Sequence, residues 1–313
     1  ATGALSFVSA PDFESPSDLD RDNVYEVEVS VSDDGTGTLS TAQTIFVTVT
    51  NANETPTFIS GISVDVLENT TVVQTVTAAD VDAGTTLTYS ISGGDDQAKF
   101  SVDGSTGALT FISAPDYEIP TDAGTNNIYE VEMTVTDNGT GPLSASQTVY
   151  VSVLNANEAP YFTSLTSVNV PENTASVQKV TATDIDAGST LTYSLTGGTD
   201  LSLFSIDGAT GSLSFILAPD FESPSDINED NVYDVQVTVV DDGAGALSVV
   251  QNISVSVTDV NEAPSLTSGT SVNVSENTVT VQFISAIDGD GDDLVFSVTG
   301  GSDQAKFSID GTT

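Results

Sequence analysis

Three related heptapeptides punctuate this sequence at a fixed interval: TNANETP at 50–56, LNANEAP at 154–160 and TDVNEAP at 258–264. The glutamate of each copy stands 104 residues after that of the copy before it (from 54 to 158, and from 158 to 262). A phrase that returns at the length of a domain marks the boundary between tandem copies of one module. The sequence therefore predicts tandem repeats joined by short linkers that carry asparagine and glutamate and close on proline.

Longer phrases return at the same interval and define the expected domains. VLENTTVV at 66–73 recurs as VPENTASV at 170–177, and the phrase that begins FSVDGSTG at 100–107 recurs as FSIDGATG at 204–211. The chain opens and closes inside such phrases, so we expect it to be a piece of something longer. The expected domains are the C-terminal half of a repeat at 1–56, complete repeats at 57–160 and 161–264, and the N-terminal half of a repeat at 265–313.

Each repeat is predicted to consist of short β-strands. In VYEVEVSVSD at 24–33, apolar side chains alternate with Glu26, Glu28 and Ser30, which is typical of a half-buried strand. Glycine pairs and Asp-Gly turns separate such segments, and no window has a convincing helical period. About seven strands in a repeat favour an antiparallel β-sandwich with Greek-key connections. The predicted fold class is all-β, with tandem seven-stranded sandwiches.

Composition excludes several functions. The chain has 46 acidic and 4 basic residues and a net charge of -42, so nucleic acid is not an expected partner. No apolar run approaches the roughly 18 residues of a membrane span, so direct membrane insertion is not expected. The chain has no Cys and no His, which excludes disulfides, thiol nucleophiles, imidazole bases and most zinc or copper sites.

Carboxylates gather at fixed places in every repeat. An early Glu is followed by an Asp-x-Asp motif, an Asp-aromatic-Glu motif and an Asp at the end of a long strand. So many like charges repel one another in a compact fold, and either salt or a bound metal should offset this repulsion. Ca²⁺ takes six to eight oxygen ligands from carboxylates, Asn side chains and backbone carbonyls, whereas Mg²⁺ takes fewer protein ligands in a tighter geometry. The donor set therefore favours Ca²⁺.

This combination of motifs, in this order, resembles the cadherin repeat over essentially the whole chain. The resemblance implies a rod of sandwiches in which several Ca²⁺ ions sit between consecutive repeats and stiffen it. The Cys-free, Ser/Thr/Asp-rich texture with near-identical copies is similar to the cadherin-like repeats of large bacterial surface proteins. An extracellular location at the cell surface is implied.

The resemblance also implies a set of Ca²⁺ ligands at each linker. Those of the first linker are Asp12, Glu14, Asn51, Asn53, Glu54, Asp80, Asp82 and Asp137. Those of the second are Glu68, Asp116, Glu118, Asn155, Asn157, Glu158, Asp184, Asp186 and Asp241. Those of the third are Glu172, Asp220, Glu222, Asp259, Asn261, Glu262, Asp288 and Asp290.

The linkers depart from the animal pattern D-x-N-D-N-x-P. They are one residue shorter and have Glu at the second acidic place, and Asn51 and Asn155 replace the first Asp. Because Asn is a neutral ligand, we expect those two linkers to bind Ca²⁺ more weakly than the linker with Asp259.

Other interpretations of the carboxylates remain open. They could form a solvated acidic surface without metal. Asp18, Asp20 and Asp22 alternate like the start of a Ca²⁺ loop and could hold an additional ion, and the related stretch 222–233 has acids at 226, 229 and 230. Paired carboxylates can hydrolyse glycosides, but an enzyme rarely repeats its active site in each module. We therefore predict no catalytic residue.

The predicted function is a calcium-rigidified extracellular stalk with a structural role or a role in cell adhesion. Its expected partners are calcium, neighbouring repeats and copies of itself arranged head-to-tail. Complementary half-repeats at 1–56 and 265–313 could join copies into a filament by strand complementation, but we favour the alternative that the ends are an arbitrary cut of a longer repetitive chain. An alternative is a calcium-dependent carbohydrate-binding module array. That array would need exposed aromatic platforms, but the chain has 7% aromatics and no Trp.

Overall fold

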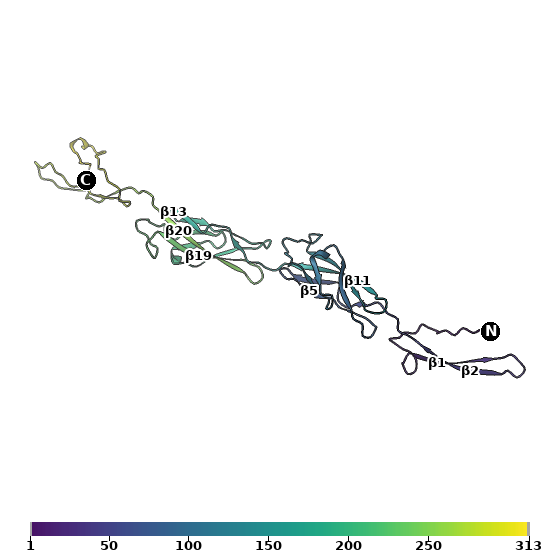
Figure 1. Ribbon diagram of the computed structural model, residues 1–313. Coiled ribbons are helices and arrows are strands. Elements are labelled where there is room, and N and C mark those ends of the chain that lie inside the picture. The colour runs from purple at the N-terminus through teal and green to yellow at the C-terminus, as the bar shows by residue number, and fades with distance from the viewer. Residues whose placement is uncertain (1, 312–313) are drawn as a thin grey trace. The chain divides into compact units, whose positions relative to one another are not determined.

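The computed structural model describes residues 2–311, which form β-strands, connecting loops and three short 3-10 turns (Figure 1). The turns are η1 (Gln97–Lys99), η2 (Leu201–Leu203) and η3 (Gln304–Lys306). Throughout the described part of the chain, no helix has the length or apolar character to cross a membrane. The chain divides into two compact units between Ala156 and Asn157, and the predicted all-β class is confirmed.

The first unit contains a complete two-layered sandwich. One sheet has the strand order β4 (Ser63–Leu67), β11 (Ser144–Leu154), β10 (Ile128–Thr136) and β7 (Thr88–Gly93). The other has the order β5 (Val72–Thr75), β9 (Ala108–Phe111) and β8 (Phe100–Val102). β4 pairs parallel to β11, and the other neighbours are antiparallel. The two sheets together contain the predicted seven strands, and a short separate pair joins β3 (Thr57–Phe58) to β6 (Ala78–Ala79).

Alternation along the strands builds the core of this sandwich. Every second side chain of β10 faces inward, and Tyr129, Val131 and Met133 are at most 1% exposed. The opposite sheet contributes Phe100 and Phe111, whose stacked rings lie 4.6 Å apart. The ring of Tyr129 meets Phe111 edge-on at 5.1 Å. Because both inner faces are apolar, the core lies between the two sheets.

The second unit repeats this architecture. Its larger sheet has the order β13 (Ser167–Pro171), β20 (Ser248–Thr258), β19 (Val232–Val240) and β16 (Thr192–Gly197), and β13, β19 and β20 lie side by side in Figure 1. Its smaller sheet has the order β14 (Ser176–Lys179), β18 (Ser212–Phe215) and β17 (Phe204–Ile206). A short pair joins β12 (Tyr161–Phe162) to β15 (Ala182–Thr183). The core again has a stacked phenylalanine pair beneath a buried tyrosine.

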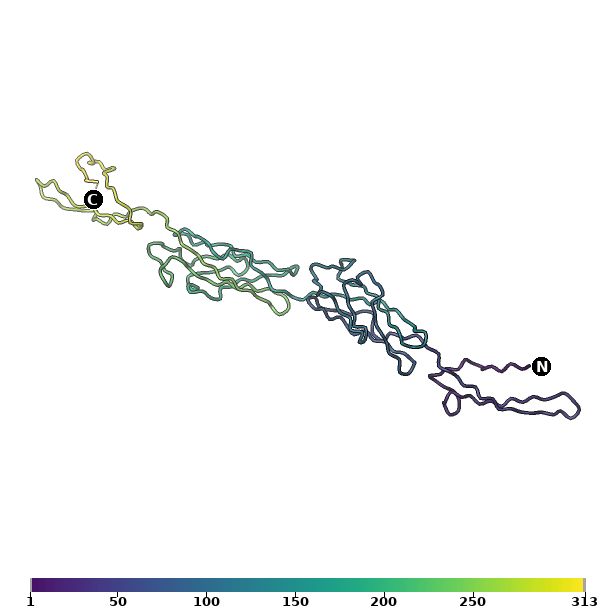
Figure 2. Tube along the Cα trace, viewed as in Figure 1, coloured from purple at the N-terminus to yellow at the C-terminus, as the bar shows by residue number. Residues whose placement is uncertain are grey.

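The flanking stretches contain isolated strand pairs. In residues 2–56, β1 (Val24–Ser32) and β2 (Ser40–Thr48) form the hairpin that Figure 2 traces in purple. In residues 265–311, β21 (Ser265–Leu266) pairs with β22 (Ala286–Ile287). Val31 of β1 is 66% exposed, whereas Val135, one repeat later on β10, is fully buried. The same strand pattern is therefore present in both places, but only β10 is covered by a second sheet.

Candidate metal centres at the linkers

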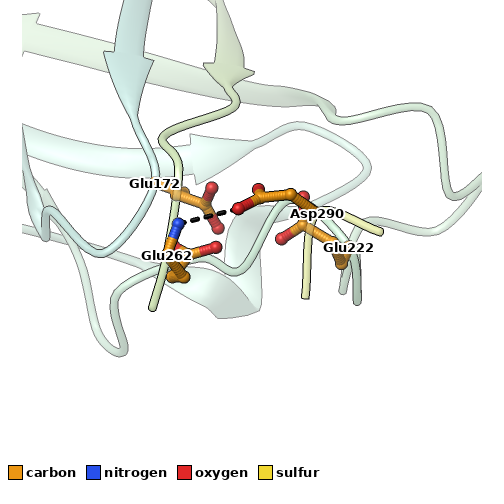
Figure 3. Close-up of side chains that lie close together, drawn as sticks. All are labelled: Glu172, Glu222, Glu262 and Asp290. Atoms are coloured by element: carbon orange, nitrogen blue, oxygen red, sulfur yellow. Dashed lines mark hydrogen bonds between the residues drawn. The ribbon is translucent and has the colours of Figure 1, made fainter. Parts of the chain in front are cut away.

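Four carboxylates converge at the third linker. One oxygen from each lies within 4.8 Å of the others, and Figure 3 shows the side chains pointing toward one another: Glu172, Glu222, Glu262 and Asp290. They come from four separate segments. The first follows β13, the second lies in the loop after β18, the third lies in the linker after β20, and the fourth lies in the loop after β22. The fold thus concentrates negative charge from distant parts of the sequence.

The early glutamate holds two of these segments by their backbones. Glu172 is 3% exposed, and its two oxygens accept hydrogen bonds from the amides of Val260 at 2.9 Å and Phe221 at 2.8 Å. In the first unit, Glu68 is 2% exposed and accepts from Ala156 at 2.9 Å and Tyr117 at 2.8 Å. This buried carboxylate therefore ties the linker to the Asp-aromatic-Glu loop in both sandwiches.

The Asp-x-Asp motif holds the linker from its other side. The second Asp of each motif accepts the backbone amide of the linker glutamate: Asp82 from Glu54 at 3.0 Å, Asp186 from Glu158 at 2.9 Å and Asp290 from Glu262 at 2.7 Å. The first Asp accepts the amide of the second, as Asp80 does from Asp82 at 2.9 Å and Asp184 from Asp186 at 3.0 Å. These contacts shape the motif into a loop whose carboxylates face the linker.

In the first and second linkers, the second of the two asparagines packs against a glycine that the sequence reasoning missed. Asn53 Nδ2 donates to Asp137 Oδ2 at 3.0 Å, and Asn157 Nδ2 donates to Asp241 at 3.2 Å. A Cβ at Gly139 would lie 1.4 Å from Asn53 Oδ1, and the corresponding distance from Gly243 to its asparagine is 1.5 Å. The Asp-x-Gly spacing at 137–139 and 241–243 was the available sequence signal for this contact.

Among the acidic groups of the first unit, two lie at or beside its linkers. Their members are Glu14, Glu54 and Asp82 at the first linker, and Glu68, Asp116 and Glu118 beside the end of β11. At the first linker, Asn51 Nδ2 also donates to Asp82 Oδ1 at 2.6 Å. The two predicted linkers whose residues lie within single units, the first and the third, thus have the clustered donors that a cation would need.

Several predicted ligands also make hydrogen bonds to nearby backbone. The first Asp of the Asp-aromatic-Glu motif accepts amides of its own turn: Asp12 from Glu14 and Ser15, Asp116 from Ile119, and Asp220 from Ser223. Asn261 Nδ2 donates to the carbonyl of Glu262 at 3.2 Å. Asn155 lies in the linker directly before Ala156, which donates to Glu68. The side chains of Asp12, Asp116, Asp220 and Asn261 therefore shape their own loops in addition to any role in binding a metal.

One linker partner was not among the predicted ligands. Asn173 follows the early glutamate Glu172, has a positive φ of 59°, and donates from Nδ2 to Glu262 Oε1 at 2.6 Å. The Glu-Asn-Thr motif that contains Asn173 repeats in the sequence. The positive φ explains why this motif carries Asn, a residue that tolerates the left-handed region.

The electrostatics of the linkers favour a bound cation. Burial raises the pKa of Glu54, and the carboxylates of Glu14 and Asp82 raise it further. Burial likewise raises the pKa of Glu262, with a further contribution from Glu172. The pKa of Asp259 is raised by burial and then by the adjacent Asp290. These groups resist ionisation because they are buried and face other carboxylates, and a divalent cation would reverse that preference.

Unpartnered oxygens provide a direct test of whether a metal fits. Glu54 Oε2 and Asp80 Oδ2 at the first linker are buried and have no hydrogen-bond partner. Asp288 Oδ1 and Asp290 Oδ1 at the third linker are also buried without a hydrogen-bond partner. A carboxylate oxygen removed from water without a donor costs free energy. Since the surrounding ligands are carboxylate and amide oxygens, these residues fit Ca²⁺.

The proposed additional ion has a different structural context in each copy. Asp18, Asp20 and Asp22 lie within 4.8 Å of one another. In the complete sandwiches, Asp122 and Asp226 are buried, and both oxygens of each accept backbone amides of the same loop. These two carboxylates therefore organise their loops directly.

Comparison with known proteins identifies the family. The cadherin domain matches residues 62–154 and 166–258, which together exceed half of the chain. Human Protocadherin Fat 1 is 30% identical over 95% of this chain and 7% of its own length. Human cadherin EGF LAG seven-pass G-type receptor 2 is 33% identical over 93% of this chain and 10% of its own length. The chain therefore spans a small fraction of these curated relatives.

Solved structures agree with the observed fold. A structure of protocadherin gammaB7 EC3-6, described as a cis-dimer, superposes with a TM-score of 0.50 at 26% identity. The superposition covers 77% of this chain and 62% of the protocadherin chain. Together with the tandem sandwiches and the recurring acidic motifs, these matches assign the protein: the chain belongs to the cadherin family and is built from cadherin domains.

Proposed function

We propose that this chain is a calcium-rigidified segment of an extracellular structural or adhesive stalk, with Ca²⁺ bound by the acidic residues of its linkers. The observation that carries the proposal is the set of buried carboxylate oxygens without partners at Glu54, Asp80, Asp288 and Asp290. Membership of a family of adhesion proteins supports the extracellular location and the absence of an enzymatic role. The other predicted ligands of each linker are proposed to bind Ca²⁺ together with these oxygens.

The rigidifying effect follows from where the carboxylates originate. Glu222 belongs to one sandwich, Glu262 to the linker, and Asp290 to the following stretch. Without a cation these carboxylates repel one another, and the linker is held by the amide hydrogen bonds to Glu172 and Asp290 and by the hydrogen bond from Asn173 to Glu262. Ca²⁺ supplies the charge that lets all of these groups approach, and the residues themselves then fix the linker backbone.

Calcium removal is the primary test. We expect excess chelator to lower the melting temperature of the chain and to increase its flexibility in small-angle X-ray scattering. The variant Asp242→Asn is a matched control, because Asp242 accepts the amide of Thr190 in the same way that Asn138 accepts the amide of Thr86. That variant should respond to Ca²⁺ as the wild type does. An unchanged melting temperature and scattering profile in chelator would contradict the proposal.

The finer features of the stalk belong to the same proposal. We propose domain bounds of 1–56, 57–160, 161–264 and 265–313, with the first and last stretches as half-repeats. Neighbouring repeats or copies arranged head-to-tail are the proposed partners, since Val31 and Phe46 of β1 and β2 expose apolar surface. A molar mass in light scattering that stays monomeric at all concentrations would contradict such assembly. A bacterial source is proposed from the Cys-free composition, although the relatives reported above are human proteins.

A further inference from the structure

The loop between β10 and β11 contains Asn138-Gly139, the only Asn-Gly dipeptide in the sequence. An asparagine side chain can react with the backbone nitrogen of the residue that follows it. Glycine favours this reaction, because it has no Cβ to keep its nitrogen away from the asparagine side chain. Asn138 is exposed, so water can reach the product of the first step. The dipeptide is therefore placed for a covalent change that needs no enzyme.

The reaction is deamidation, and its only co-reactant is water. The nitrogen of Gly139 attacks Cγ of Asn138, so that an N–Cγ bond forms and the Cγ–Nδ2 bond breaks. Ammonia leaves with the proton that the attacking nitrogen gives up, and a succinimide ring remains. Water then opens the ring at one of its two carbonyls. Opening at the side-chain carbonyl gives aspartate, and opening at the backbone carbonyl gives isoaspartate, in which the main chain runs through the former side chain.

In the closed loop, both reacting groups are engaged in other hydrogen bonds. Asn138 Oδ1 accepts the amide of Thr86 at 2.8 Å. The amide of Gly139 donates to Asp137 Oδ1 at 2.9 Å. Asp137 is buried and also accepts the amide of Leu143 at 3.1 Å, which closes the loop. Because the attack has to break these bonds, the reaction must start from conformers in which the loop has opened.

The second sandwich shows that the loop accommodates an aspartate. Asp242 stands one repeat after Asn138 in the sequence and accepts the amide of Thr190 at 2.7 Å, which is the contact that the asparagine makes in the first sandwich. The next contact is also kept, since the amide of Gly243 donates to Asp241 Oδ1 at 2.9 Å. An aspartate formed at position 138 can therefore take the place of the asparagine without a change in the loop.

An isoaspartate cannot keep the same contacts. It lengthens the backbone directly before Gly139, whose amide is held by Asp137. The backbone of Gly139 also lies so close to the side chain of Asn53 that no Cβ fits between them. A displaced Gly139 therefore loses its hydrogen bond and disturbs the packing of the asparagine. The two products of one reaction should differ in their effect on the stability of the sandwich.

We propose that Asn138 is a site of spontaneous deamidation, and that the reaction proceeds through open conformers of the loop 137–143. The loop keeps its hydrogen bonds in the aspartate product and loses them in the isoaspartate product. The first sandwich thus acquires with time a carboxylate at the place where the second sandwich is synthesised with Asp242. This inference does not depend on the binding of calcium.

The test follows the full chain in chelator at neutral and alkaline pH, both in native buffer and in urea that unfolds it. Tandem mass spectrometry locates the mass gain that accompanies replacement of ammonia by water. We expect this gain at Asn138 and not at Asn252, which is followed by the bulky Ile253. The rate should rise with pH, because the attacking nitrogen must lose its proton. It should be at least about tenfold faster in urea, because loop opening limits the reaction in the folded chain.

Two variants match this measurement. Asn138→Asp should abolish the mass gain at this position and should melt at the same temperature as freshly prepared wild type. Asp242→Asn creates an Asn-Gly dipeptide in the equivalent loop of the second sandwich, which should then gain the same mass. An isoaspartate-specific methyltransferase identifies the isoaspartate fraction of aged wild type. After chromatographic separation, that fraction should melt at a lower temperature than Asn138→Asp.

Each part of the proposal can be overturned separately. A folded chain that shows no mass gain at Asn138, over an incubation that converts it in urea, would overturn the assignment of the site. Equal rates in native buffer and in urea would overturn the requirement for loop opening. An isoaspartate fraction that melts as high as Asn138→Asp would overturn the difference between the products. If Asp242→Asn fails to fold, the comparison of Asn138 with Asn252 in the wild type still decides the first point.

Discussion

The contact between Asn53 and Gly139 gives a prediction whose size can be worked from the structure. A Cβ at residue 139 would lie 1.4 Å from Asn53 Oδ1, so Gly139→Ala must expel the asparagine side chain. The expelled amide loses its 3.0 Å hydrogen bond to Asp137. The carboxylate of Asp137 is buried but keeps the amides of Gly139 and Leu143. We therefore expect a cost near the lower end for a hydrogen bond to a charged group, about 1.5 kcal/mol.

A double-mutant cycle isolates this contact. Gly139 lies outside the left-handed region of backbone conformation, so alanine meets no conformational barrier once the asparagine is gone. Gly139→Ala should then be nearly neutral in an Asn53→Ala background. The coupling energy between the two positions should be about 1.5 kcal/mol, which is within the range seen for residues in direct contact.

The chain contains its own probe for this measurement. Met133 is the only methionine, it is fully buried, and it lies on β10, the strand that leads into Asp137. Its methyl resonance in a urea titration reports the unfolding of this sandwich alone. If Gly139→Ala costs the same in the wild-type and Asn53→Ala backgrounds, the packing of the asparagine is not the cause and the reasoning is wrong.

Three further outcomes are expected. Gly107→Ala should destabilise the same sandwich by more than about 1 kcal/mol, measured with the same methyl probe, because Gly107 has a φ of +73° and a Cβ would lie 2.2 Å from the carbonyl oxygen of Val76. Tyr129→Phe should cost about 1 kcal/mol in that assay, because it leaves the amide of Thr121 without its 3.2 Å acceptor. Calcium affinity should fall as pH is lowered through the raised pKa of Glu262, since protons compete for the carboxylate. Without calcium, the stability of the fold should change in the opposite direction. The pKa of Glu262 is higher in the folded than in the unfolded chain, so protonation removes its repulsion and the chain becomes more stable as pH falls. Calorimetric titrations at several pH values, paired with melts in chelator, check both signs.

Local pattern was sufficient to predict the strands and their faces. Alternation places Val131 and Val149 on the inner faces of β10 and β11, and both are fully buried. The same alternation occurs in β1, yet Val31 stays exposed. A period of two identifies which face is apolar, but it carries no information about which segment covers that face.

The candidate sites were less accessible to sequence reasoning, because their contacts join distant segments. Recurring acids identified Glu172 and Asp290, but nothing local indicated that Glu172 accepts amides from two other segments. The spacing of the acids near Asp226 suggests an additional ion loop. In the structure, Glu229 and Asn231 adopt positive φ values, which turns their loop so that the amides after Glu229 point at the Asp226 carboxylate.

The shared anchoring of the linker by Glu172 and Asp290 has a consequence for how such a chain can change in length. The amides of Val260 and Glu262 lie two residues apart, and each is held by a different carboxylate. An insertion of one residue between them would break one of these bonds. Gain or loss of a whole repeat, by contrast, returns every linker to an equivalent pair of carboxylates, because the neighbouring copy carries the same anchors. Recombination between copies can therefore lengthen or shorten the array in whole repeats without creating a defective joint.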